Sequence, residues 1–130
     1  MDSATDGWAF GFVNFPYNHT SSYNVVWHFN GSQWVRGTLP GTVDSNATIL
    51  GMSMDSASDG WAVGYGNGQK YGNRYALYLH YTHGQWVAVQ GPGSDNLNSV
   101  FMLSANEGWA GGNGGVLMHY LNGTWTQYQP

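Results

Sequence analysis

Three histidines stand in matching surroundings along the chain, and imidazole is a common metal ligand. They are His28, His80 and His119, and each is followed six residues later by a tryptophan. A zinc ion needs ligands that converge on one point at about 2.0–2.1 Å. Histidines that recur once per structural unit lie in separate places, so we expect each to hold a neighbouring loop or strand by a hydrogen bond. The sequence therefore predicts no metal ion and no cofactor.

Three acidic residues, Asp6, Asp59 and Glu107, each stand directly before a Gly-Trp pair. Two carboxyl groups held about 5–10 Å apart across one sugar can hydrolyse a glycoside. These acids also occur once per repeat, in a Ser-Ala-x-Asp/Glu-Gly turn, where an aspartate bonds its own backbone two residues on. The sequence has no Gly-rich phosphate loop and no His-Glu-x-x-His or Gly-x-Ser-x-Gly motif. We therefore expect that the protein is not an enzyme.

These residues belong to two motifs that recur in step three times, and the repeat is the main organising signal of the chain. The first motif is Asp-Gly-Trp-Ala-x-Gly from Asp6 and from Asp59, and Glu-Gly-Trp-Ala-Gly-Gly from Glu107. The second motif contains the histidine and the later tryptophan, and each copy then reaches a proline. Fixed spacing in three copies indicates three equivalent structural units.

The segments within a unit predict short β-strands. Residues 25–29 and 76–81 are rich in β-branched and aromatic side chains, and Asn30-Gly31 and Asn122-Gly123 are typical of tight hairpin turns. No segment has a sustained helical stripe of apolar residues. Each complete unit is therefore expected to contain four strands, the first of them near residues 48–54 and 97–103.

Four-stranded units of about 40–50 residues, each with a Gly/aromatic motif, are typical of β-propeller blades. We expect an all-β chain of about three blades, each a four-stranded antiparallel sheet, with the first blade lacking most of its inner strand. The predicted blade 1 is residues 1–40 (incomplete), blade 2 is residues 41–92 and blade 3 is residues 93–130.

The same motifs resemble the bacterial β-propellers of the photosystem II stability factor and sialidase-like (Asp-box) group. The resemblance covers nearly the whole chain and rests on the Gly-Trp-Ala-x-Gly strand and the Leu-His-aromatic strand. It implies the propeller fold. Residues 82–86 and 121–125 lack the aspartate of the Asp-box, and the chain has only Arg36 and Arg74 where a sialidase is expected to have an arginine cluster. A fragment of a sialidase-like glycoside hydrolase is therefore only the second alternative function.

The repeated tryptophans are predicted to fill the core between blades, because an aromatic side chain buries a large apolar area. They are Trp8, Trp34, Trp61, Trp86, Trp109 and Trp125. Three blades in a row leave two aromatic faces without a neighbour. Either the chain is part of a longer propeller or copies of it join head to tail. We expect association of copies, with a six-blade dimer as the simplest closed ring and an open filament as the alternative.

Blades 1 and 2 have about ten more residues than blade 3 between the Gly-Trp motif and the histidine. Functional residues concentrate in loops on a rigid scaffold, and these loops are expected to share a face with the blade connections at 40–48 and 92–98. Tyrosine and asparagine there suit a neutral sugar. The predicted ligand-binding residues are Tyr17, Asn18, Tyr23, Tyr65, Asn67, Lys70, Tyr71, Asn73 and Arg74. A tolerated insertion without a ligand is the alternative.

Composition limits the classes of partner. With 3 Lys+Arg, 7 Asp+Glu and a net charge of −4, the chain is poorly suited to bind nucleic acid. It has no apolar run long enough for a membrane helix, and without cysteine it has no disulfide. Low charge with abundant Gly, Asn and Thr suits a secreted or cell-surface protein. We expect a non-catalytic recognition module that binds a glycan or another surface polymer; the first alternative is a self-assembling structural protein.

Overall fold

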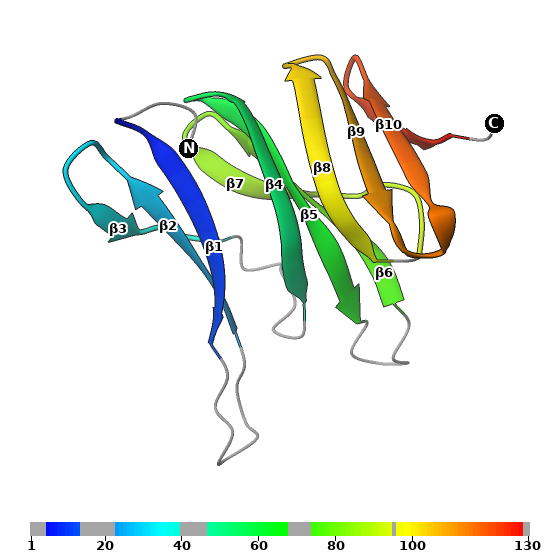
Figure 1. Ribbon diagram of the computed structural model, residues 1–130, viewed down its shortest axis with the longest axis horizontal. Helices are drawn as coiled ribbons and strands as arrows, with labels where there is room; N and C mark the ends of the chain where they lie inside the picture. The colour runs from blue at the N-terminus through cyan, green and yellow to red at the C-terminus, as the bar shows by residue number, and fades with distance from the viewer. Residues whose placement is uncertain (1–4, 14–22, 40–46, 68–73, 95, 129–130) are drawn as a thin grey trace, which may run out of the picture.

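The computed structural model describes residues 5–13, 23–39, 47–67, 74–94 and 96–128. These residues form three antiparallel sheets, in which neighbouring strands follow one another in the chain. Figure 1 shows the sheets side by side as a fan, in chain order from the N-terminal to the C-terminal sheet. This is the arrangement of blades in a partial β-propeller, so the predicted fold class is confirmed, including the first blade of three strands.

The strands are as follows. Blade 1 contains β1 (Gly7–Val13), β2 (Tyr23–Phe29) and β3 (Trp34–Arg36). Blade 2 contains β4 (Thr48–Ser56), β5 (Asp59–Asn67), β6 (Arg74–Thr82) and β7 (Gln85–Val89). Blade 3 contains β8 (Leu97–Ser104), β9 (Glu107–Gly112), β10 (Leu117–Leu121) and β11 (Thr124–Gln127), with a short 3₁₀ turn at Asn113–Gly115 after β9.

The turn between the last two strands differs among the blades. Asn122 and Gly123 have φ of 48° and 96° and form the expected two-residue hairpin turn. His83 and Gly84 form a similar turn in blade 2, which the sequence did not lead us to expect. The prediction of a tight turn at Asn30-Gly31 is wrong, because the loop there spans residues 30–33. The Asn30 side chain accepts hydrogen bonds from the backbone N–H groups of the two residues that end this loop.

The core lies between the blades. Side chains alternate along a strand, so each blade presents one set to the preceding blade and the other set to the following blade. One buried cluster joins blades 1 and 2 and includes Trp8, Val26, Leu79 and Trp86. A second joins blades 2 and 3 and includes Trp61, Tyr78, Met102, Met118 and Trp125.

The described part of the chain contains no helix that is both long and apolar enough to cross a membrane.

Candidate functional site

Each blade contains a cluster of one histidine, one acidic residue and one tryptophan, which we call the His–acid–Trp trio. In blade 2, His80 lies opposite Trp61 across β5 and β6, and the two rings stack with their centroids 4.3 Å apart. The His80 Nε2 atom is 2.9 Å from Asp59 Oδ1. The corresponding ring and hydrogen-bond distances are 4.2 and 2.7 Å in blade 1 and 4.0 and 2.9 Å in blade 3. The members of the other trios are His28, Asp6 and Trp8, and His119, Glu107 and Trp109.

The trio corrects the expectation that the acidic side chains bond their own backbone. A serine hydroxyl holds the turn before the second strand instead. Ser56 Oγ accepts a hydrogen bond from the Ser58 backbone N–H at 3.2 Å, and Ser104 Oγ accepts one from Asn106 at 3.1 Å. The acidic residue that follows is left to accept a hydrogen bond from the histidine, since an ionised carboxylate offers only acceptors.

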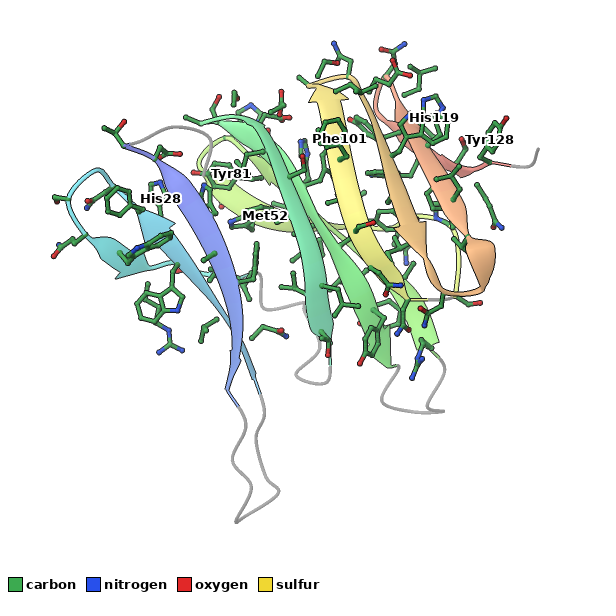
Figure 2. The ribbon with its side chains drawn as sticks, in the orientation of Figure 1. His28, Met52, Tyr81, Phe101, His119 and Tyr128 are labelled. Atoms are coloured by element: carbon green, nitrogen blue, oxygen red, sulfur yellow. The ribbon has the colours of Figure 1, made fainter. Side chains whose placement is uncertain are left out.

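The histidines are separate from one another. Figure 2 shows His28 and His119 at opposite ends of the molecule. Each histidine already has a carboxylate partner in its own blade. Over the described ranges, no group of three histidine or acidic side chains is placed to hold one metal ion. The trio therefore ties the second strand of a blade to the third.

Asp55 adds a second carboxyl group beside the blade 2 trio. Burial, and after it the neighbouring Asp59 carboxyl, raise the pKa of Asp55 from 3.8 to about 6. Asp55 Oδ1 and Asp59 Oδ2 are both shielded from solvent and, while both carboxyl groups are ionised, neither atom accepts a hydrogen bond from a described residue. Two carboxylates held close together resist ionising at the same time, so the folded state favours a proton on this pair.

We expect Asp55→Asn to stabilise the protein at pH 8 by about 1 kcal/mol and to change its stability little at pH 4. Because folding raises the pKa of Asp55, the stability from its protonated form is complete below pH 3.8 and is lost as the pH rises through about 6. Asparagine stays neutral throughout. The partial exposure of the side chain keeps the effect small. Urea denaturation at both pH values measures it, and an equal difference at pH 4 and pH 8 would contradict this origin.

The predicted ligand-binding residues lie only partly within the described residues. Tyr65 and Arg74 are described with their side chains. Tyr23 and Asn67 are placed at the ends of β2 and β5, respectively, by their backbone alone. The remaining predicted residues lie outside the described ranges: Tyr17, Asn18, Lys70, Tyr71 and Asn73.

The structure brings Tyr65 and Arg74 together. The Arg74 guanidinium carbon lies 4.9 Å from the centroid of the Tyr65 ring, within the range of a cation–π interaction. Arg74 Nη1 also donates a hydrogen bond to Asn96 Oδ1 at 3.0 Å. Asn96 belongs to the connection between blades 2 and 3, so this contact places the start of β6 and that connection at one end of the sheets. The loop of blade 2 itself lies outside the described residues.

Polar side chains of blade 3 continue this face. Asn98 Nδ2 donates to Asn113 Oδ1 at 2.9 Å. We call the surface around Tyr65, Arg74, Asn96, Asn98 and Asn113 the loop end; it lies along the lower edge of blades 2 and 3 in Figure 1. The three asparagines were not among the predicted residues. The sequence signal for Asn96 and Asn98 was the expected position of the 92–98 connection, whereas Asn113 lies outside that segment, in the turn after β9.

A cavity of about 610 Å³ opens at the same end of blade 2, where β6 begins and β7 ends. Its lining is mostly apolar, with Tyr75 and Gln90 as the larger polar side chains. Cavities of this size and character are typical of binding sites that use a few polar groups to orient a ligand. The lining residues are Tyr75, Ala76, Leu77, Ala88, Val89, Gln90 and Gly91.

Comparison with known proteins supports the fold. No protein-family model matches the chain. No curated protein matches it either. A solved structure described as "YCF48 bound to D1 peptide" is similar, with a TM-score of 0.56 and 17% sequence identity. The match covers 98% of this chain and 44% of that one, so the present chain spans less than half of its length. At this identity the likeness shows a shared β-propeller fold, to which the repeat motifs had pointed.

Proposed function

We propose that the protein is a non-catalytic recognition module that binds a glycan at the loop end. The observation that carries the proposal is the position of Arg74, which is held over the Tyr65 ring and bonded to Asn96. A guanidinium has five N–H donors. Among the described residues Arg74 uses one of them, in the bond to Asn96, which leaves donors for a ligand. The Tyr65 ring and the asparagine amides of the loop end match the apolar faces and hydroxyl groups of a sugar.

The environment of the acidic residues supports a non-catalytic role. Each trio acid accepts a hydrogen bond from its own histidine, and each histidine is stacked on a tryptophan. The trios occur once per blade, which suits a repeated structural contact better than one reaction centre. Turnover in a panel of fluorogenic glycosides, the sialosides included, would favour the hydrolase alternative.

A polypeptide ligand is the second candidate. The lining of the cavity is largely aliphatic, which suits the side chains of an extended peptide. The similar solved structure, by its title, contains a bound peptide. A peptide would place apolar side chains in the cavity.

Binding of the protein to a glycan array and a peptide array tests the two candidates. We expect Arg74→Ala to weaken binding to the recognised glycan by at least about tenfold, and Tyr65→Ala to weaken it less. Arg74→Lys keeps the charge but loses the planar group that lies over the ring, so it should restore little. Arg36→Ala on β3 is the matched control and should bind as the wild type does.

The arrays also give the outcomes that would overturn the proposal. Binding to peptides alone, with loss on Arg74→Ala, would replace the glycan by a polypeptide ligand. Glycan binding that survives both Arg74→Ala and Tyr65→Ala would remove the loop end as the site.

A further inference from the structure

The two interfaces between blades use one arrangement of aromatic rings. The Trp8 ring of blade 1 lies 4.8 Å from Tyr81 and 5.6 Å from Trp86 of blade 2, and its plane is 89° from that of Trp86. The Trp61 ring of blade 2 repeats this pattern on blade 3. It lies 5.0 Å from Tyr120 and 5.4 Å from Trp125, at 86° to the latter. The trio tryptophan of one blade thus packs against an aromatic pair on the next blade.

Blade 1 carries the same aromatic pair on its outward side. Phe29 and Trp34 lie opposite each other across β2 and β3, with centroids 5.4 Å apart and planes at 48°. In the internal interfaces the pair is 5.2 Å apart at 49° in blade 2 and 5.2 Å apart at 45° in blade 3. We call this side of blade 1 the receiving face; it contains Trp27, Phe29 and Trp34.

The receiving face has no neighbour among the described residues. Trp34 is 46% exposed, whereas the corresponding Trp86 and Trp125 are 3% and 6% exposed. Trp27 is 38% exposed on the same side. The receiving face is therefore an exposed site whose rings already have the internal geometry, without the tryptophan that packs on them in the two internal interfaces.

Blade 3 offers the matching tryptophan on its outward side. Trp109 stacks on His119 at 18°, as Trp8 stacks on His28 at 19°. It also contacts Tyr128 edge-on at 5.6 Å. We call this side the tryptophan face, and Figure 2 shows its Phe101, His119 and Tyr128 at the C-terminal end of the fan.

The tryptophan face is more apolar than the equivalent side of blade 2. Phe101 and Leu103 are 64% and 60% exposed, and the corresponding residues of blade 2 are Ser53 and Asp55. Leu117 and Leu121, on either side of His119 in β10, are also exposed. Large exposed apolar side chains gathered on one face are typical of an interaction surface.

We propose that a second copy of this chain docks head to tail, with Trp109 of one copy against Phe29 and Trp34 of the other. The two faces are the two halves of the internal interface, which argues for a copy of the chain as the partner. Because the contact joins two different surfaces, it repeats until the rotation closes. Two copies of three blades give six, within the 4–8 blades of known propellers. The loop end takes no part in this junction, so failure of the dimer proposal would not affect the ligand proposal, and failure of the ligand proposal would not affect the dimer proposal.

Sedimentation of the purified chain over a range of concentrations tests the junction. We expect a species of about twice the 14.2 kDa of one chain. Trp34→Ala and Trp109→Ala should each raise the dimer dissociation constant at least about tenfold. Phe101→Ser, which installs the residue that blade 2 has at this place, keeps the test valid if Trp109→Ala unfolds. Leu50→Ser is the control, since Leu50 is 44% exposed but belongs to the middle blade.

Mixing the two tryptophan variants separates a head-to-tail junction from a symmetric one. The Trp34→Ala chain keeps an intact tryptophan face and the Trp109→Ala chain keeps an intact receiving face, so the mixture should recover dimers through one intact junction. A symmetric contact would recover none, and that result would overturn the proposal. So would a single-chain mass for the wild type at every concentration, or a dimer that both substitutions leave unchanged. If the wild type forms fibres and each of Trp34→Ala and Trp109→Ala abolishes them, the head-to-tail junction is supported, and it then builds an open filament instead of a closed ring.

Discussion

Replacing Trp61 by alanine is expected to lower the free energy of unfolding by about 3–5 kcal/mol. Trp61 is only 2% exposed and stacks on His80 within its own blade. Across the interface it contacts Tyr120 and Trp125 of blade 3. Alanine would leave a cavity between two sheets, and rigid strands collapse into such a space only in part. Urea denaturation followed by tryptophan fluorescence and circular dichroism measures the loss.

Trp109→Ala is the matched control, because Trp109 has the same place in the repeat but no following blade among the described residues. It is half-buried, and its ring contacts among the described residues are with His119 and Tyr128. We expect it to cost less than half as much, when measured at a dilution at which the wild type is a single chain. Equal losses for the two variants would mean that contacts within a blade, and not the packing between blades, decide stability.

The sequence was sufficient to predict the fold because each blade repeats the same local pattern. The expected first strands near 48–54 and 97–103 correspond to β4 and β8. Glycine, aromatic and β-branched residues recur at fixed spacing, so a strand that is ambiguous in one copy can be assigned from the equivalent segment of another copy. The turn at Asn30 was wrong because the Asn-Gly pair also suits a longer loop in which the asparagine side chain bonds the backbone.

The sequence allowed us to predict the members of the trio but not the contacts between them. Its histidine and its acid were recognised as repeated positions, but they are separated by 22, 21 and 12 residues in the three blades. Only the register of two adjacent strands brings them together, and spacing along the chain does not encode that register. The same limit explains Asn96, which meets Arg74 across 22 residues of sequence.

Some equivalent positions carry different residue types in different blades, depending on whether they face another blade. Ser53 of blade 2 faces blade 3 and accepts a hydrogen bond from the Met102 backbone N–H at 3.0 Å. Phe101 has this place in blade 3 and is exposed. A polar residue therefore serves the internal interface, whereas an aromatic residue stands on the outward face. The trio, by contrast, is kept in every blade, since each blade needs its second and third strands joined.

Replacing Gly112 by alanine is expected to cost about 3 kcal/mol, because an added Cβ would overlap the backbone carbonyl oxygen of Asn96. Backbone cannot rotate away as a side chain can, so β8 would have to shift against β9. The same carbonyl accepts a hydrogen bond from the Asn113 backbone N–H at 3.0 Å, which the shift would strain. Gly64→Ala should behave alike, since its Cβ would overlap the carbonyl oxygen of Thr48 in blade 2.

Gly111→Ala, one residue earlier in β9, is the control for Gly112→Ala. A Cβ at Gly111 would lie 3.7 Å from Ser99 Oγ, an ordinary van der Waals distance. Because glycine within a strand loses more conformational freedom on folding than alanine, this variant should be neutral or more stable by about 0.5–1 kcal/mol. The free energies of unfolding of the two variants, measured by urea denaturation, should therefore change in opposite directions or differ by about 3 kcal/mol. If Gly112→Ala is as stable as Gly111→Ala, the Asn96 carbonyl is not held tightly against β9. The close pairing of the first and second strands would then not explain why the repeated motif ends in glycine.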